Sequence, residues 1–233
     1  MKELEILEVI ENNEILLDFK NKRSFGGSCA LVGNSGNLMD EDNGKFIDTH
    51  DFIIRCNEAR VEGFESKVGS RTDIRMANSH LFHAAIENTT LDIQNMTNLF
   101  SKFERYFLYT LKNESIIVKN GVSKSHFSSV LDKLQKNNNN EVIFLNQHLY
   151  NYLINVTGNH PTTGFIGLLI ALKYFDKINC FGFSFFKEED WSKKHYYEDI
   201  KPYDISSHNF EIEEQIFKNF VSLGKINMYP SLV

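Results

Sequence analysis

The chain has 233 residues, of which 42% are hydrophobic, and it carries 25 basic and 31 acidic side chains. This length suits one domain with a sizeable core, and the composition excludes collagen-like, disordered and low-complexity proteins. The net charge of −6 argues against a general nucleic-acid binder, because neutralising phosphates takes clustered excess lysine and arginine.

The opening segment, residues 1–20, mixes apolar and charged side chains at helical spacing, which predicts an amphipathic helix interrupted near Asn12 and Asn13. It lacks the uninterrupted apolar stretch of a secretion signal. The longest apolar run, Phe165–Leu172, falls far short of the roughly 18 residues that span a bilayer. Three cysteines in a chain of this length do not make a disulfide framework and fit a reducing compartment. We therefore expect a cytoplasmic protein, with peripheral contact at the inner face of a membrane left open.

After Gly26 and Gly27, short apolar runs alternate with helical patterns. Such alternation predicts an α/β fold with a mainly parallel sheet covered by helices on both faces. Ligands of these folds bind beyond the carboxyl ends of the strands. The expected strands are Cys29–Val32, Asp51–Cys56, Asp73–Met76, Tyr106–Leu111, Val142–Leu145, Lys177–Phe181 and Ile226–Met228, and the expected helices are Ser79–Glu87, Ser123–Lys136, Thr163–Phe175 and Asn209–Leu223.

Two segments between these elements predict loops. Residues 137–140 form a run of asparagines typical of a solvated turn. Residues 187–207 are rich in charged and aromatic side chains without a clear period, which predicts a long loop of the kind that often serves in binding.

A glycine turn, Gly33-Asn34-Ser35-Gly36-Asn37, follows the first strand of the alternating region. Its glycines lie three apart and do not meet the G-x-G-x-x-G pattern, so no nicotinamide or flavin cofactor is expected. The loop can bring backbone N–H groups and the amides of Asn34 and Asn37 close to an anion or a polar ring. A purely structural turn is an equally open interpretation.

A second candidate, His160-Pro161-Thr162-Thr163-Gly164, precedes an almost wholly apolar helical pattern. Hydroxyls and free N–H groups at the start of a buried helix favour an anion through donors and the helix dipole together. Simple capping of the helix by threonine is the alternative.

The third candidate consists of His195 and His208, with Glu213 five residues beyond the latter. A histidine with a pKa near 6.5 can take a proton from a hydroxyl or, when charged, stabilise a leaving phosphate. No His-x-x-x-His or Cys-x-x-Cys spacing accompanies them, so we expect no metal site. A structural role for each histidine is the alternative.

Together these clusters resemble the sialyl motifs of the animal-type sialyltransferase family, over roughly residues 29–213. Relatives in the Golgi have a membrane anchor and stem, whereas this chain offers only a polar helix before Cys29, so it is similar to a soluble bacterial-type or viral-type member. The matching segments are Cys29–Leu38, Ile47–Asn57 and Gly63–Thr72 for the long motif, Pro161–Gly164 through Phe181–Phe183 for the short motif, His195–Glu198 for the third motif, and His208 with Glu213 for the very short motif.

The resemblance implies a Rossmann-like α/β/α sandwich forming a single catalytic domain over residues 1–233, with residues 1–28 as an N-terminal helical extension. It implies metal-independent transfer of sialic acid, with inversion, from CMP-sialic acid to a hydroxyl of an oligosaccharide or glycolipid acceptor. No cofactor beyond the donor is expected. His208 would be the general base, His195 would stabilise the leaving phosphate, and Glu213 would orient. The donor contacts carried over are Asn34, Ser35, Gly36, Asn57, Thr162, Thr163, Gly164 and Gly182.

Other functions share these residues and stay open: transfer of another CMP-activated acidic sugar, hydrolysis of the donor, and non-catalytic binding of a CMP-sugar or glycan. The acceptor is not readable, although its specificity should lie in residues 78–120 and 187–207, where Trp191, Tyr196 and Tyr203 could stack on sugars.

The chain departs from the family pattern at two positions. Many relatives bridge the first cysteine of the long motif to one late in the short-motif helix, where Phe175 stands here, so we predict that Cys29, Cys56 and Cys180 are free thiols. A bridge between Cys29 and Cys180, which lies five residues after Phe175 on an expected strand, is the alternative. His160 stands where many relatives have tyrosine.

Overall fold

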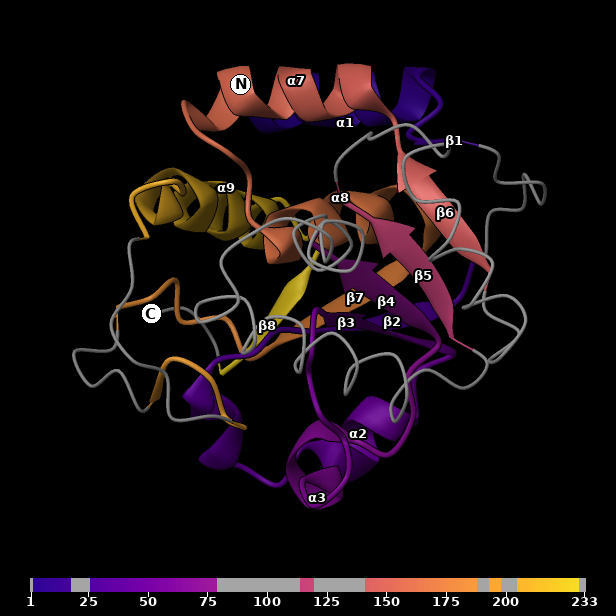
Figure 1. The fold of residues 1–233 in the computed structure, drawn as a ribbon, viewed down its shortest axis with the longest axis vertical. Helices are drawn as coiled ribbons and strands as arrows, with labels where there is room; N and C mark the ends of the chain where they lie inside the picture. Colours follow the sequence, from indigo (N-terminus) through magenta and orange to yellow (C-terminus); the bar gives the residue numbers. More distant parts are fainter. Residues whose placement is uncertain are drawn as a thin grey trace, which may run out of the picture.

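The computed structural model describes residues 2–17, 26–78, 114–119, 141–187, 193–197 and 205–230. Within these ranges the strands form one eight-stranded sheet in the order β1-β6-β5-β4-β3-β2-β7-β8 (Figure 1). The strand expected at 106–111, the helices expected at 79–87 and 123–136, and the asparagine run at 137–140 lie outside the described residues, as do Trp191, Glu198 and Tyr203.

The sheet is parallel throughout except for its first edge strand, β1, which runs antiparallel to β6. This confirms the mainly parallel α/β fold. The sequence did not indicate β5 or β1, whereas the other strands lie within a residue or so of the expected ranges. The strands are β1 (Leu16–Leu17), β2 (Ser28–Val32), β3 (Phe52–Cys56), β4 (Ile74–Ala77), β5 (Ser115–Val118), β6 (Val142–Leu145), β7 (Lys177–Phe181) and β8 (Asn227–Tyr229).

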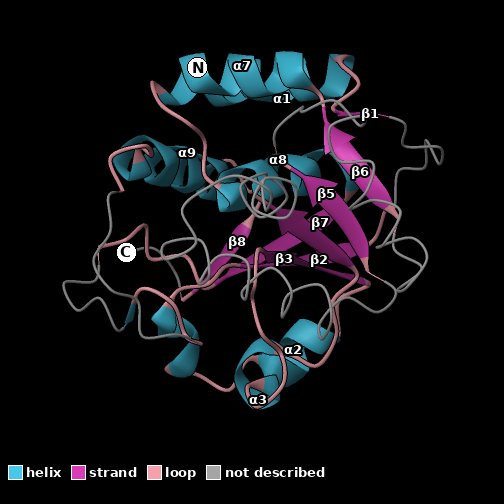
Figure 2. Cartoon of the chain, viewed as in Figure 1, coloured by secondary structure: helices cyan, strands magenta, loops and turns pink. Residues whose placement is uncertain are grey.

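Helices cover both faces of the sheet (Figure 2). On one side α8 and α9 lie next to the strands with α1 and α7 beyond them, and α2 and α3 lie on the other side (Figure 1). The helix α7, which Asn146 caps through its side chain, was not expected from the sequence. The helices are α1 (Lys2–Asn12), the 3-10 turn η1 (Gly36–Met39), α2 (Gly44–Asp48), α3 (Glu65–Val68), α7 (Gln147–Thr157), α8 (Thr163–Tyr174) and α9 (Phe210–Ser222).

The central strands are buried on both faces, which explains their continuous apolar runs. In β2, Cys29 and Leu31 pack into the core beneath α8, whereas Ala30 and Val32 pack into a smaller core on the side of α2. Because successive side chains of a strand point to opposite faces, these four residues of β2 contribute to two cores.

The N-terminal segment differs from the helical extension expected for residues 1–28. Its helix ends at Asn12, and the chain then adds β1 to the edge of the sheet, where Leu16 lies opposite Leu145. Ile6 and Ile10 of α1 are fully buried in the main core, and Lys173 of α8 donates to the carbonyl oxygen of Asn13 at 3.0 Å. Residues 2–17 are therefore built into the core.

The three cysteines are free thiols, as predicted. Cys29 and Cys180 lie on neighbouring strands, with Leu31 rather than Cys29 opposite Cys180 in the register. Burial raises the pKa of Cys56 to about 12, so this thiol stays protonated at neutral pH. None of the described helices has the length and apolar character needed to cross a membrane.

Candidate active site

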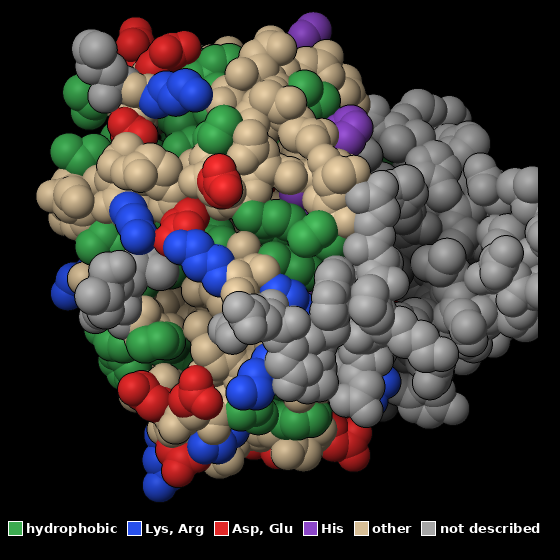
Figure 3. Space-filling model, turned by 90° about the vertical axis from the view of Figure 1, so that its left-hand side faces the viewer, with side chains coloured by type: hydrophobic (Ala, Val, Ile, Leu, Met, Phe, Trp, Pro, Cys, Tyr) green, Lys and Arg blue, Asp and Glu red, His purple; other side chains and the backbone are tan. Residues whose placement is uncertain are grey.

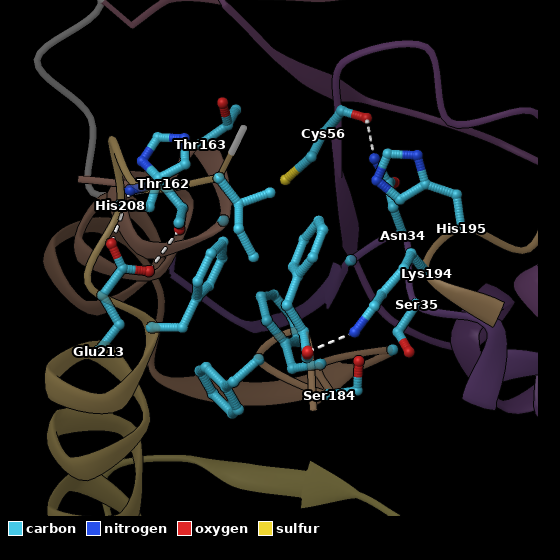
Figure 4. A pocket seen from close by; sticks show the side chains of 18 of the residues that line it. Asn34, Ser35, Cys56, Thr162, Thr163, Ser184, Lys194, His195, His208 and Glu213 are labelled. Carbon is cyan, nitrogen blue, oxygen red and sulfur yellow. Dashed lines mark hydrogen bonds between the residues drawn. The ribbon is translucent and has the colours of Figure 1, made fainter. Parts of the chain in front are cut away.

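A pocket of about 270 Å³ lies at the carboxyl ends of the central strands, where ligands of doubly wound sheets bind. The turns that follow β2, β3 and β7 form its floor, and the first residues of α8 and α9 form one wall. The segment of residues 193–197 contributes to the opposite wall (Figure 4).

Every residue assigned a site role from the sequence lines this pocket, except Gly36. They converge from distant parts of the chain: the glycine turn, the turn after β3, the start of α8, and two histidines beyond residue 190. Gly36 lies instead against the 193–197 segment, where a Cβ atom would come within 2.5 Å of the Lys193 carbonyl oxygen. The lining residues among those assigned are Asn34, Ser35, Asn57, Thr162, Thr163, Gly164, Gly182, His195, His208 and Glu213.

His208 has a fixed tautomer. Its Nδ1 lies 2.7 Å from the carbonyl oxygen of His160, so Nδ1 carries the proton and donates, which leaves Nε2 with a lone pair. Burial is the main cause that lowers the pKa of His208 below its usual value of 6.5, and the charge of Lys119 acts in the same direction. At neutral pH the imidazole is therefore uncharged and able to accept a proton.

Glu213 binds the start of α8 rather than His208. Its two oxygens accept the backbone N–H of Thr162 at 2.7 Å and the hydroxyl of Thr162 at 2.5 Å (Figure 4). The same hydroxyl accepts the N–H of Phe165, so carboxylate and cap form one chain of hydrogen bonds. Glu213 is 1% exposed, and burial raises its pKa to about 7.

This arrangement changes the role expected for Thr162. Its N–H and hydroxyl are engaged by Glu213, so they hold the helix instead of facing a ligand. The N–H groups of Thr163 and Gly164, in the first turn of α8, have no partner four residues back in the helix. These two lining residues are the donors that the helix start offers to the pocket.

The opposite wall is held by backbone, amide and ring contacts and by Lys194, whose Nζ donates to the carbonyl oxygen of Phe186 (Figure 4). The backbone N–H of Tyr196 donates to the carbonyl oxygen of Asn34 at 3.0 Å, which ties the 193–197 segment to the glycine turn. The amide of Asn34 donates to the carbonyl of Cys56 at 3.3 Å and to the hydroxyl of Tyr197 at 3.4 Å. His195 stacks on Tyr197 with ring centroids 5.4 Å apart, and it faces the pocket from the side opposite His208 (Figure 4).

Comparison with known proteins decides the family. The model of glycosyltransferase family 29 (sialyltransferase) matches residues 4–225. The chain belongs to this family. The match begins within α1, ahead of the glycine turn, which agrees with the place of α1 in the core.

The relatives within family 29 are distant. CMP-N-acetylneuraminate-beta-galactosamide-alpha-2,3-sialyltransferase 1 of Pan troglodytes is 24% identical over 219 residues, which cover 89% of this chain and 60% of that protein. Beta-1,6-galactosyltransferase GALT29A of Arabidopsis thaliana is 25% identical, covering 82% and 50% respectively. The chain thus spans 60% or less of the length of these two relatives. A crystal structure of a mammalian sialyltransferase has the same fold, with a TM-score of 0.63 and 19% identity, covering 97% of this chain and 77% of that one.

Sequence reasoning missed the aromatic wall of this family 29 pocket. Phe186 stacks on Phe210 at 4.6 Å, and Phe183 packs on Phe217 at 5.0 Å. Phe185 and Phe186 have φ angles of 52° and 57°, a conformation that bulky side chains rarely adopt. Phenylalanines look like core residues in a sequence. Only the place of Phe183, Phe185 and Phe186 after the end of β7 could have indicated a pocket.

Lys119 does not line the pocket, but its charge acts on two residues that do, and nothing in the sequence indicated this. It follows β5, is 3% exposed, and its backbone N–H donates to the carbonyl oxygen of Ala77. Burial lowers its pKa to about 8, and its charge in turn lowers the pKa values of His208 and Glu213.

The described residues contain no group of three or more histidine, cysteine or acidic side chains that could hold a metal ion. On the face shown in Figure 3, lysine and arginine lie interspersed with acidic side chains.

Proposed function

We propose that this chain transfers sialic acid from CMP-sialic acid to a hydroxyl of an oligosaccharide or glycolipid, with inversion at the anomeric carbon. The observation that carries the proposal is the pair of imidazoles on opposite sides of one pocket at the strand ends, one of them held as a neutral base. Membership of family 29 and the names of the relatives support the donor.

His208 acts as the general base. Its Nε2 takes the proton of the acceptor hydroxyl while the acceptor oxygen bonds to the anomeric carbon from the face opposite the phosphate. The hydrogen bond from Nδ1 to His160 supports the charge that develops on the ring. General-base help of this kind contributes about 10² to 10⁴ in rate.

The bond from the anomeric carbon to the phosphate oxygen breaks, and CMP leaves with the electron pair. His195 in its charged form and the N–H groups of Thr163 and Gly164 meet the negative charge on the phosphate. Preorganised donors of this type each lower the activation barrier by roughly 3–4 kcal/mol. Glu213 takes no part in the reaction and holds the start of α8 in place.

Asn34 supports recognition of the nucleotide. Its Oδ1 is buried and has no hydrogen-bond partner among the described residues, and such acceptors are rare in folded proteins. A hydroxyl or amino group of the donor would complete it. The rest of the pocket beside Asn34 is lined by Asn57, Gly182 and the phenylalanine wall.

The acceptor is proposed from the relatives. The Pan troglodytes relative is named for a β-galactosamide acceptor and an α-2,3 linkage, and a mammalian sialyltransferase has been solved with Gal-beta-1-3GalNAc-ortho-nitrophenol. A galactosyl-β-1,3-N-acetylgalactosaminide is therefore the first acceptor to try. Cytoplasmic location and contact with a membrane surface stay predictions.

The test is release of CMP from CMP-sialic acid, measured with and without this acceptor, with the product linkage determined by NMR. Acceptor-dependent release supports transfer, and equal release in both reactions would identify a hydrolase. Activity only with another CMP-activated acidic sugar would change the donor assignment. Calorimetry showing no affinity for CMP would overturn the proposal.

A further inference from the structure

Asn57 has an unusual backbone conformation for a residue other than glycine, with a φ angle of 51°. Its N–H donates to the carbonyl oxygen of Met76 at 2.7 Å, and its Oδ1 accepts the N–H of Asn78 at 2.9 Å. With Oδ1 engaged, the NH₂ group is what Asn57 can offer to the pocket that it lines. Asn57 would therefore donate to an acceptor oxygen of a ligand, and only while its backbone keeps this conformation.

Arg75 holds the loop that carries Asn57. It lies in β4 on the face of the sheet away from α8, since its neighbours Ile74 and Met76 pack into the main core. From there its Nη1 donates to the carbonyl oxygens of Asn57 at 2.9 Å and Ala59 at 3.0 Å. One nitrogen thus fixes two carbonyls of the same turn.

Glu114 fixes the guanidinium in turn. Its two oxygens accept Nε of Arg75 at 2.5 Å and Nη2 at 2.9 Å, a bidentate pair in which both side chains are almost fully buried. Burying such a pair adds little net stability over apolar side chains of similar size. Its planar geometry, however, gives Nη1 a single direction, toward the Asn57 turn.

We propose that Arg75, oriented by Glu114, is a positioning residue for the nucleotide half of the donor, acting through Asn57. The inference rests on the proposed binding of a CMP-sugar in this pocket. Arg75 touches no ligand itself, and its contribution appears in nucleotide affinity and not in proton transfer at His208.

The direct test is Arg75→Lys, which keeps a positive charge beside Glu114 but lacks the fork that reaches both carbonyls. We expect the Kd for CMP, measured by calorimetry, and the KM for the donor each to rise about tenfold. The pH profile of kcat should keep its shape. An unchanged Kd in the folded variant would overturn the inference.

Arg55→Lys is the matched control. Arg55 lies opposite Arg75 in the register of β3 and β4 and is fully buried on the same face of the sheet. Its Nη2 donates to the carbonyl oxygens of Val68 and Arg71, away from the Asn57 turn. We expect a fall in Tm like that of Arg75→Lys, with the Kd for CMP within twofold of wild type. An equal loss of affinity in both variants would reduce the role of Arg75 to stability.

A double-mutant cycle separates positioning from general loosening. Asn57→Gly removes the amide and keeps the backbone conformation accessible. In that background Arg75→Lys should leave the CMP affinity within twofold, because the group it positions is gone. A further tenfold loss would overturn the inference. Should Arg75→Lys not fold, Glu114→Asp, which keeps both charges and shortens the arm, makes the same comparison.

The controls also separate this inference from the proposed function. Wild-type protein that does not bind CMP would overturn both. Wild-type protein that binds CMP, loses affinity with Asn57→Gly and keeps it with Arg75→Lys would overturn only the role of Arg75.

Discussion

The two walls of the pocket are held together in different ways. The wall of α8 and α9 contains the buried carboxyl group of Glu213 and the half-buried imidazole of His208, and burial shifts both pKa values in the direction that favours the neutral forms. The wall of the glycine turn and residues 193–197 is held by backbone and amide hydrogen bonds, by stacked rings and by the hydrogen bond from Lys194 to the carbonyl oxygen of Phe186. The first arrangement decides which groups can accept a proton, and the second decides the shape of the pocket.

This difference predicts how variants should divide. A substitution in the α8 and α9 wall should change kcat and the dependence on pH, because the groups there titrate near neutrality. A substitution in the opposite wall, other than at His195, should change nucleotide affinity and leave the pH profile as it was. A variant that moves both quantities equally would show that the walls act as one unit.

The largest effect expected is that of His208→Ala. Loss of the base should lower kcat by about 10² to 10⁴ while the Kd for CMP stays within a few-fold of wild type. Since burial lowers the pKa of His208, the acid limb of the wild-type kcat profile should lie below pH 6.5. His148→Ala is the control, because this exposed histidine lies on α7 outside the pocket. Near-normal transfer by His208→Ala would make the assignment of the base wrong.

The next largest effect is expected of Glu213→Gln, on how the free energy of unfolding depends on pH. The carboxyl has a pKa of about 7 when folded against 4.5 as the ordinary value, so the folded state binds more protons between these values. Its contribution to stability is fully present below pH 4.5 and is lost as the pH rises to 7. The difference amounts to about 3 kcal/mol over this window.

A glutamine can still accept the N–H of Thr162 and donate to its hydroxyl, so the variant should fold. Denaturant unfolding of both proteins at pH 5 and pH 8 measures the change. The unfolding free energy of Glu213→Gln minus that of wild type should be larger at pH 8 than at pH 5, because wild type loses stability over this range. A constant difference between the two proteins would show that Glu213 is ionised throughout.

A smaller effect, on the other wall, is expected from Gly33→Ala. A Cβ atom there would come within 2.4 Å of the carbonyl oxygen of Gly182, so the backbone must shift. We expect a loss of stability of about 1–3 kcal/mol and CMP binding weakened at least tenfold. Gly164→Ala is the comparison, since its Cβ would meet only the edge of the Phe183 ring, at 2.8 Å. The effect of Gly33→Ala should be the larger, as thermal unfolding and calorimetry can show.

Much of this site was predictable because its residues follow strand ends and carry recognisable chemistry. The glycine turn after β2 and the histidines beyond residue 190 met that condition, although Gly36, next to the lining Ser35, does not itself line the pocket. The fold followed from apolar runs such as Cys29–Val32, which appear as β2. In contrast, β1 escaped because two leucines have no period of their own, and only their pairing with β6 makes them a strand.

The remainder depended on contacts between distant residues. Glu213 was expected to orient within the site, but nothing in its spacing from His208 indicated that Thr162 would be its partner. Lys119 and Arg75 are ordinary charged residues in the sequence. Lys119 is buried just past the end of β5, and Arg75 is buried within β4, where it contacts Glu114 and the Asn57 turn. Long-range pairing of this kind leaves no local pattern to read.

The smallest effect expected is that of Tyr197→Phe, which tests whether the second wall binds through shape alone. The hydroxyl of Tyr197 accepts from the amide of Asn34 over 3.4 Å, so its removal should cost about 0.5 kcal/mol and raise the Kd for CMP two- to threefold. Tyr152→Phe is the control, since it removes a bond of similar length, to Glu5, far from the pocket. A rise beyond tenfold with Tyr197→Phe would instead mean that the hydroxyl contacts the nucleotide, because orienting Asn34 through one long neutral hydrogen bond is too weak to produce it.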